Sequence, residues 1–248
     1  MMLTRKLGFY EKYIKRILDI ICALTAMVAF CWLYAIIAVA VRVKLGAPII
    51  FKQPRPGLVD PKTGKERVFI LYKFRTMSDK RDQNGNLLPD KERLGKFGEM
   101  LRATSLDELP EAINILKGDM SVIGPRPQLV RDMVFMSEEQ RMRHTARPGL
   151  SGLAQVKGRN AITWDEKIKW DLKYLEQVGF WTDIKLVWLT FKKVFIQEKN
   201  TDNAMETDLN LDYGDALLRD KRIEKTEYDA LQAYARDIII EFESRRVR

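Results

Sequence analysis

The chain has 248 residues, a formal net charge of +9, one histidine and two cysteines. These counts exclude a zinc site built from several histidines, and they exclude a disulfide framework because Cys22 and Cys31 lie inside one apolar run. The polar part of the chain holds no thiol nucleophile, so carboxylates would carry most of any catalytic chemistry.

The positive charge is unevenly distributed along the chain. Residues 202–248 hold 8 basic and 12 acidic side chains, whereas residues 1–201 carry a net charge of +13. A body of this charge attracts anionic lipid head groups, nucleotides or nucleic acid. A basic surface that is merely solvated is the plainer alternative.

The N-terminal region predicts a membrane segment. Residues 20–41 are apolar apart from Thr25, a length that fills the hydrocarbon core of a bilayer and exceeds the apolar region of a cleavable signal. Cytoplasmic flanks are normally the ones enriched in lysine and arginine, so a simple span would export one of two basic clusters. We therefore expect a hairpin that enters and leaves on the cytoplasmic face. The basic flanks are Arg5, Lys6, Lys12, Lys15 and Arg16 before the segment and Arg42, Lys44, Lys52 and Arg55 after it.

The following segment predicts a strand, a loop and a helix. Prolines and a glycine break regularity at residues 48–57, and residues 68–72 have the composition of a short strand. Residues 79–90 are polar and predict a surface loop. Apolar residues recur at helical spacing over residues 94–101, so Arg102 is expected to end a helix.

An acidic pair, Asp107 and Glu108, lies between Arg102 and Arg126, which indicates a site for a metal ion and a phosphorylated substrate. Ser105 and Glu108 also fit a capping box before an apolar-periodic helix. The two carboxylates could therefore simply cap that helix and offset its dipole. Capping does not exclude catalysis, because a helix start keeps a carboxylate ionised and attracts phosphate.

The C-terminal half is aromatic and then acidic. Residues 164–195 interleave aromatic side chains with lysines, so these helices are expected to lie flat on a bilayer, although the aromatics could equally form an ordinary core. Residues 200–214 indicate a linker, and residues 217–242 a charged helix that could pack against a second copy of the chain as a homodimer. His144 is expected to be structural or phosphate-facing rather than a general base.

Six motifs follow one another in a fixed order. They are YKFRTM at 72–77, SLDEL at 105–109, LKGDMS at 116–121, GPRP at 124–127, RPG at 147–149 and GRNA at 158–161. In this order they resemble the bacterial sugar transferases, the monotopic phosphoglycosyl transferases, over roughly residues 12–200. The resemblance implies transfer of a sugar 1-phosphate from a UDP-sugar to polyprenyl (undecaprenyl) phosphate with release of UMP, the first membrane step of glycoconjugate or exopolysaccharide assembly.

The resemblance also implies roles for single residues. Asp107 is expected to attack the sugar-bearing phosphorus and form a covalent phosphosugar intermediate, and Glu108 to bind Mg²⁺ on the diphosphate. One-step transfer with Asp107 as a base is the enzymatic alternative. Arg102 is expected near the lipid or transferred phosphate and Arg126 near the nucleotide. Further cations within the matched motifs are candidates for binding phosphate or nucleotide: Lys73, Arg75, Arg147 and Arg159.

This chain departs from the family at two places. The family breaks its re-entrant helix with a Ser-Pro pair, whereas the corresponding place here holds Cys31 and Trp32, which lack the intrinsic kink of proline. The basic residues on both flanks still favour the re-entrant geometry. The second departure is Leu153, where an aromatic residue is common in the family.

Together these observations predict a mostly helical α+β protein in the bacterial inner (cytoplasmic) membrane. Residues 1–46 would form a re-entrant membrane helix, and residues 201–248 a linker and a charged helix. Residues 47–200 would form a catalytic domain on the cytoplasmic face, with interfacial amphipathic helices and a small sheet.

A membrane-anchored basic module that binds nucleic acid or an acidic partner is the alternative from another class. It accounts for the charge and the aromatic residues, but not for an acidic pair set among cations. The enzyme interpretation instead predicts a UDP-sugar, polyprenyl phosphate and membrane lipid as partners, and no nucleic acid.

Overall fold

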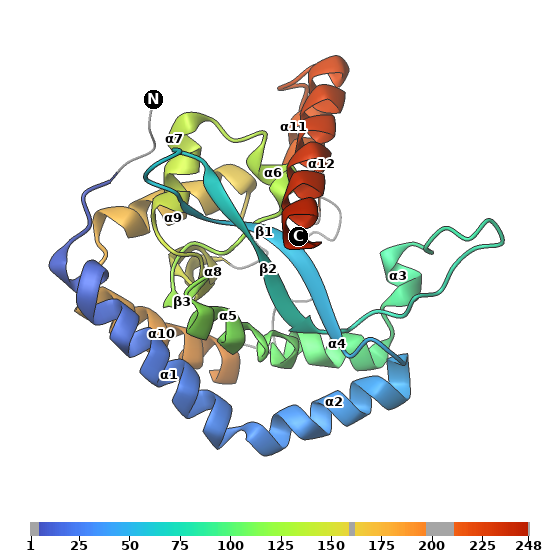
Figure 1. Ribbon diagram of the computed structural model, residues 1–248, viewed down its shortest axis with the longest axis horizontal. Coiled ribbons are helices and arrows are strands. Elements are labelled where there is room, and N and C mark those ends of the chain that lie inside the picture. The colour runs from blue at the N-terminus through green and yellow to red at the C-terminus, as the bar shows by residue number, and fades with distance from the viewer. Residues whose placement is uncertain (1–4, 159–161, 197–210, 248) are drawn as a thin grey trace. The chain divides into compact units, whose positions relative to one another are not determined.

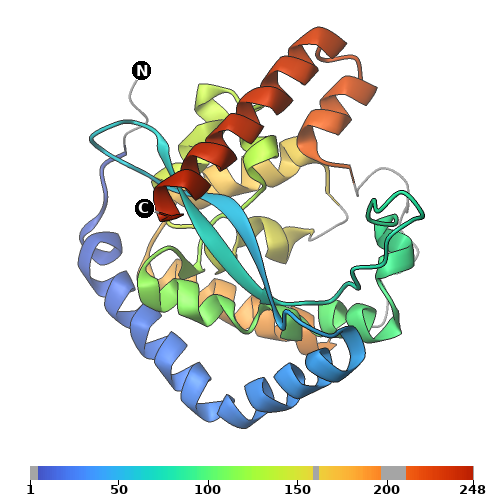
Figure 2. The same cartoon turned by 45° about the vertical axis from the view of Figure 1, so that its right-hand side comes forward.

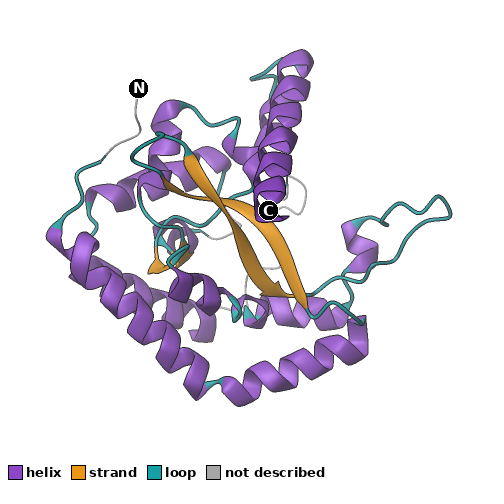
Figure 3. Ribbon diagram, viewed as in Figure 1, coloured by secondary structure: helices purple, strands orange, loops and turns teal. Residues whose placement is uncertain are grey.

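The computed structural model describes residues 5–158, 162–196 and 211–247. Helices dominate these residues and strands are few (Figure 3), which confirms the predicted mostly helical α+β fold. The first elements are η1 (Tyr10–Ile14), α1 (Lys15–Ala29), α2 (Cys31–Leu45), β1 (Ile50–Val59), β2 (Glu66–Phe74), α3 (Asp90–Arg93), α4 (Lys96–Ala103), η2 (Leu106–Glu108) and α5 (Glu111–Lys117). They are followed by β3 (Ser121–Ile123), α6 (Val130–Met133), α7 (Glu138–Arg141), η3 (Met142–Thr145), β4 (Gly149–Ser151), α8 (Leu153–Lys157), α9 (Trp164–Glu176), α10 (Phe180–Ile196), α11 (Tyr213–Arg219) and α12 (Lys225–Val247).

The chain forms two compact units. Unit 1 consists of Met1–Ile17, Pro54–Phe69 and Asp119–Arg248, and unit 2 of Leu18–Gln53 and Ile70–Gly118. The strands β1 and β2 pair in a two-stranded sheet and contribute residues to both units. The predicted three-part division at residues 46 and 200 stays a prediction.

The N-terminal apolar segment is two helices with a sharp bend between them. No single helix in the described ranges is long and apolar enough to cross a membrane, but Tyr10–Ala29 and Cys31–Leu45 together meet that test and bend by 66°. Phe30 leaves the helical region, with φ −108° and ψ 15°, and its carbonyl accepts bonds from Leu33 and Tyr34 at 2.9 and 3.1 Å. The bend seen in Figure 1 thus lies one residue before Cys31 and needs no proline.

Both helices of this pair expose large apolar side chains at helical spacing. The exposed residues are Ile17, Ile21, Leu24 and Val28 on α1 and Trp32, Ile36, Val39 and Val43 on α2. The opposite face of α2 is buried in a cluster centred on Ile37, Val41, Phe74 and Leu101. Covering only one face of α2 leaves the other available to an apolar environment.

The strand β1 was not expected. Pro54 and Pro56 were predicted to break regularity, but both lie inside Ile50–Val59. A two-stranded sheet leaves an outer edge on each strand, where proline does no harm because its missing N–H would have no ladder partner. The predicted strand at residues 68–72 is confirmed by β2, which is two residues longer at each end.

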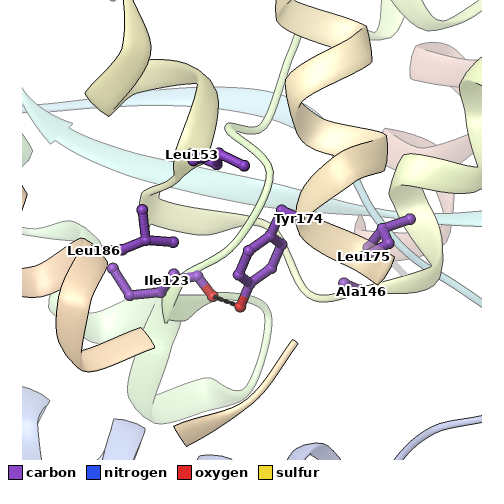
Figure 4. Packing of buried hydrophobic residues seen from close by; sticks show 6 residues of the cluster. All are labelled: Ile123, Ala146, Leu153, Tyr174, Leu175 and Leu186. Carbon is purple, nitrogen blue, oxygen red and sulfur yellow. Dashed lines mark hydrogen bonds between the residues drawn. The ribbon is translucent and has the colours of Figure 1, made fainter. Parts of the chain in front are cut away.

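The core of unit 1 lies around Tyr174, which is 1% exposed. Figure 4 shows its ring among aliphatic side chains, with its hydroxyl donating to the carbonyl of Ile123 at 3.4 Å. The other members drawn are Ala146, Leu153, Leu175 and Leu186. The short parallel strands β3 and β4 run beside this core, in a register that pairs Ser121 with Gly149 and Ile123 with Ser151.

Within unit 1, a buried carboxylate of α10 holds η1 and the first residues of α1. Asp183 of α10 accepts hydrogen bonds from the hydroxyls of Tyr10 and Tyr174, both at 2.8 Å, and it also pairs with Lys15. A buried carboxylate needs such partners because removing an unpaired charge from water is costly. These contacts fix the first turns of η1 and α1.

The C-terminal helices belong to unit 1 and pack on its helix α6. Figures 1 and 2 show α11 and α12 side by side. The buried Asp132 of α6 accepts the backbone N–H of Tyr213 at 2.9 Å, and Ala235 of α12 lies in a cluster with Val130 and Met133. The predicted helix at residues 217–242 is two helices, α11 and α12. The predicted linker at residues 200–214 lies mostly outside the described residues, and its last two residues, Tyr213 and Gly214, are not linker but the start of α11.

Candidate active site

The predicted site residues fall into two groups, one in each unit. Unit 2 holds Lys73, Arg75, Arg102, Asp107 and Glu108. Unit 1 holds Arg126 and Arg147. Arg159 lies outside the described residues.

The acidic pair lies on a strained turn. Asp107, which is 7% exposed, and Glu108 belong to the single 3₁₀ turn η2, and Ser105 before it has a left-handed backbone with φ 55°. This conformation costs a residue other than glycine about 1–3 kcal/mol, and such strain concentrates at functional sites. The predicted capping box is wrong: Ser105 makes no side-chain cap, and α5 begins only at Glu111. The left-handed backbone explains this, because a capping residue normally has an extended one.

The turn is fixed to the bent helix pair. The hydroxyl of Tyr34 on α2 donates to the carbonyl of Leu109 at 2.6 Å. Leu106 and Leu109 also pack against the cluster that buries one face of α2. Asp107 is thus held between two anchored leucines at a fixed position relative to the apolar helix.

A lysine gathers two carboxylates beside Asp107. The Nζ atom of Lys73 lies 2.7 Å from Glu108 Oε1 and 3.2 Å from Glu111 Oε1. The side chains of Lys73 and Glu108 are each 16% exposed and that of Glu111 is 2% exposed, so these attractions act where water screens little. Sequence reasoning missed Glu111, because its burial depends on the fold and not on a local pattern.

Another buried residue holds this lysine's strand in register. Asn114 of α5 donates to the carbonyl of Ile70 at 2.6 Å and accepts the N–H of Tyr72 at 3.1 Å. Its side-chain amide therefore completes the hydrogen bonding of β2 next to Lys73. Asn114 is 0% exposed, and no local sequence pattern marks it as important.

Arg102 and Arg75 have different surroundings. Arg102 lies at the end of α4, as predicted, with an exposed side chain whose Nε atom donates to Thr76 Oγ1 at 3.0 Å. Arg75 is buried and binds the carbonyls of Leu45 and Ala47 and the carboxylate of Asp79. Arg75 thus stabilises the negative end of α2, and its predicted role toward phosphate stays a prediction.

In unit 1, tight backbone contacts bring together the loops that carry Arg126 and Arg147. The N–H of Gly149 donates to the carbonyl of Pro125 at 2.9 Å. A Cβ atom on Gly149 would meet the backbone nitrogen of Gly124 at 2.1 Å, and one on Gly124 would meet the carbonyl oxygen of Arg147 at 2.3 Å. Only glycine allows this approach.

A second cation belongs to the surroundings of Arg126. Burial lowers the pKa of Lys167, the charge of Arg126 lowers it further, and Asp132 and Asp171 oppose the change. The charges of Asp132 and Asp171 thus partly balance the repulsion between these two cations. In the sequence Lys167 is one of several lysines interleaved with aromatic residues over residues 164–195, and nothing there links it to Arg126.

His144 has a structural role, which is one of the two roles predicted for it. It is buried, its Nδ1 atom donates to Glu66 Oε1 at 3.0 Å, and its Nε2 atom lies 3.3 Å from Arg143 Nη1. Burial lowers the pKa of His144 to about 4, although the bond to Glu66 opposes this. Burial raises the pKa of Glu66, but hydrogen bonds from His144 and Arg141 outweigh it and bring the pKa to about 2. The histidine is therefore neutral at pH 7 and the glutamate ionised.

No group of three or more histidine, cysteine, aspartate or glutamate side chains in the described part of the chain is arranged to hold a metal ion. This does not conflict with Mg²⁺, which is usually bound through one or two carboxylates together with water and substrate phosphates. Glu108 and the neighbouring Asp107 supply oxygen ligands of the required kind.

Comparison with known proteins identifies the class. The model of the family "bacterial sugar transferase" matches residues 10–197. The chain belongs to this family, which confirms the predicted enzyme class and decides against a mere binding module. The match ends before α11 and α12, so the C-terminal helices lie beyond the part shared with the family.

Individual relatives are bacterial sugar transferases. The chain is 44% identical over 185 residues to the "uncharacterized sugar transferase EpsL" of Bacillus subtilis (strain 168), which covers 75% of this chain and 89% of that protein. It is 34% identical over 205 residues to a UDP-glucose:undecaprenyl-phosphate glucose-1-phosphate transferase of Caulobacter vibrioides, covering 77% and 71%. A Klebsiella pneumoniae protein with the same description is 35% identical over 194 residues, but the chain spans only 40% of its length.

Proposed function

We propose that this protein transfers a sugar 1-phosphate from a UDP-sugar to polyprenyl phosphate and releases UMP. The observation that carries this proposal is the acidic pair of η2. Asp107 is largely buried on a strained turn that is anchored to the apolar helix α2, and its neighbour Glu108 is paired with Lys73. The names of the relatives give the same two substrates.

The reaction proceeds in two displacements at one phosphorus atom. A carboxylate oxygen of Asp107 bonds to the sugar-bearing phosphorus, and the bond from that phosphorus to the bridging oxygen breaks, so UMP leaves with the electron pair. A phosphate oxygen of the polyprenyl phosphate then attacks the same phosphorus and displaces the Asp107 carboxylate. Two steps let one small site accept two bulky substrates in turn.

The charges around Asp107 support this order of events. A carboxylate approaches a dianionic diphosphate only when cations reduce the repulsion. Lys73 is held beside the pair by Glu108 and Glu111, and Arg102 presents an exposed guanidinium at the end of α4. Glu108 would hold Mg²⁺, which when bound neutralises charge on the diphosphate and polarises its oxygens.

The bent helix pair supports a location at the cytoplasmic face of the bacterial membrane. Its exposed apolar faces and its basic flanks fit a re-entrant hairpin better than a span that would export one of the flanks. In unit 1, α10 exposes Trp181, Ile184, Trp188 and Phe191 at helical spacing, with Lys185 and Lys192 interleaved, which is the pattern of an interfacial helix.

The proposal is tested with purified protein in detergent or nanodiscs, Mg²⁺, polyprenyl phosphate and a panel of UDP-sugars. One UDP-sugar should give UMP release, and Asp107→Asn should abolish it while the melting temperature stays close to that of the wild type. Glu99→Gln, a change at an exposed acidic residue of α4, is the matched control and should leave the rate unchanged. Turnover by Asp107→Asn at the wild-type rate would remove this residue as nucleophile.

A further inference from the structure

Arg143 of η3 is one of the most buried side chains among the described residues, at 1% exposure. Its guanidinium is divided among three partners. Nε and Nη2 donate to Asp171 Oδ2 of α9 at 3.0 and 2.6 Å, and Nη1 lies 3.3 Å from the ring of His144. Nη2 also donates to the backbone carbonyl of Arg126 at 2.6 Å.

A buried ion pair of this kind contributes little net stability. Desolvation of both charges offsets most of their attraction, and apolar residues of similar volume often do as well or better. The pair does fix the orientation of its partners, because a planar guanidinium can bind a carboxylate and a carbonyl in fixed directions at the same time. Of the two contacts outside the ion pair, one goes to the ring of His144 and the other to the backbone carbonyl of Arg126.

Three consecutive carbonyls around Arg126 each have a donor. The carbonyl of Pro125 accepts from Gly149 N–H at 2.9 Å, and that of Pro127 accepts from Arg55 Nη1 at 3.1 Å. Arg143 binds the carbonyl between them. The backbone is therefore held before, at and after Arg126, while the side chain of Arg126 stays partly exposed.

We propose that Arg143 is a positioning residue, which holds the backbone of Arg126 so that the Arg126 guanidinium is preorganised for the nucleotide diphosphate of the donor substrate. This inference rests on the proposed function, in which Arg126 binds the UDP-sugar. Preorganisation lowers the cost of ordering a cation when the anion arrives, so its loss should weaken donor binding selectively.

The test is a double-mutant cycle between Arg143 and Arg126. Arg143→Lys keeps the charge beside Asp171, but an ammonium cannot hold Asp171 and the Arg126 carbonyl in the fork geometry. It should raise KM for the UDP-sugar about tenfold, leave KM for polyprenyl phosphate unchanged, and change kcat less than about threefold. In an Arg126→Gln background the same change should raise KM less than about twofold, because the group that it positions is gone.

Arg141→Lys is the matched control. Arg141 lies two residues away and makes two hydrogen bonds to the buried Glu66, but the structure records no contact from it to the carbonyls at 125–127. Arg141→Lys should lower the melting temperature and leave KM for the UDP-sugar unchanged. Its effect should be the same in the Arg126→Gln background. If Arg143→Lys fails to fold, Asp171→Asn takes its place, because it loosens the same guanidinium while keeping an oxygen acceptor.

The possible outcomes distinguish a failure of this inference from a failure of the proposed function on which it rests. A tenfold rise in KM that persists in the Arg126→Gln background, or equal effects on both substrates, would show that Arg143 acts only on stability and would overturn the inference alone. Wild-type protein that releases no UMP from any UDP-sugar would overturn the proposed function and the inference together.

Discussion

The turn that carries Asp107 and the loops that carry Arg126 and Arg147 are held in place by different means. The turn depends on charge and on a strained backbone: Lys73 lies between two carboxylates, and Ser105 has a left-handed conformation. The loops depend on close glycine contacts and on the carbonyls at 125–127, which accept from the backbone of Gly149 and from the side chains of Arg143 and Arg55. The ion pairs of Lys73 can be replaced by pairs with a substrate or a metal ion. A close backbone approach, in contrast, cannot change without separating the strands β3 and β4. Under the proposed function, the first construction would suit the reacting Asp107, and the second would hold Arg126 in a fixed position for the donor substrate.

The largest expected effect is on the charged turn. Lys73→Met leaves the carboxylates of Glu108 and Glu111 buried without this cation, so the free energy of unfolding should fall by about 4 kcal/mol. Thermal unfolding of the variant in detergent measures this. Lys96→Met, at an exposed position of α4, is the control and should change stability by less than about 0.5 kcal/mol. Equal melting temperatures for the two variants would mean that the lysine does not hold the turn.

The loops of unit 1 should respond to a single methyl group. Gly149→Ala places a Cβ atom 2.1 Å from the backbone nitrogen of Gly124, where only backbone can give way, and should cost about 3 kcal/mol. Gly95→Ala is the matched control, because nothing lies within 4 Å of its added atom. The measurement is the difference between the melting temperatures of the two variants. A Gly149→Ala variant as stable as its control would show that the loops carrying Arg126 and Arg147 are not closely packed.

Stability should also depend on pH through His144. The unfolded histidine takes up a proton below its ordinary pKa of 6.5, whereas the folded one does so only near 4, so folding loses stability as the pH falls through this window. Between pH 6.5 and pH 5 the loss should be about 1.5 kcal/mol. Melting temperatures recorded at both pH values should fall for the wild type and much less for His144→Gln. The same slope in both proteins would assign the pH dependence to another group.

The smallest expected effect is at the contact between the helix α2 and Leu109, the residue that follows the turn η2. Tyr34→Phe removes the 2.6 Å bond to the carbonyl of Leu109 and should cost about 1 kcal/mol. Tyr13→Phe, at a half-exposed position, should be neutral in the same assay. A neutral Tyr34→Phe would mean that apolar packing alone anchors the turn.

Local patterns in the sequence predicted part of this structure. Helical spacing placed α4 and put Arg102 at its end, and β-rich composition placed β2. The same reasoning failed at Pro54 and Pro56, where the edges of a two-stranded sheet tolerate what the middle of a larger sheet would not. It also failed at Ser105, whose capping pattern is overridden by a left-handed backbone.

The remaining features depend on contacts between distant parts of the chain. The motifs located Asp107 and Glu108, but Glu111 gains its importance from Lys73 on another element. Arg143 and Asp171 are 28 residues apart and no spacing rule links them. Polar residues of this kind are recognised only when their burial and partners are known.

The most direct test of the account is the mass of the protein after brief exposure to the donor substrate alone. Wild-type protein mixed with Mg²⁺ and the active UDP-sugar, without polyprenyl phosphate, and then quenched in acid should gain the mass of one phosphosugar, located on Asp107 by peptide mapping. Addition of polyprenyl phosphate before the quench should remove the adduct. UMP release that requires polyprenyl phosphate, with no adduct on Asp107 at any time, would contradict the two-step mechanism and favour direct transfer with Asp107 as a base.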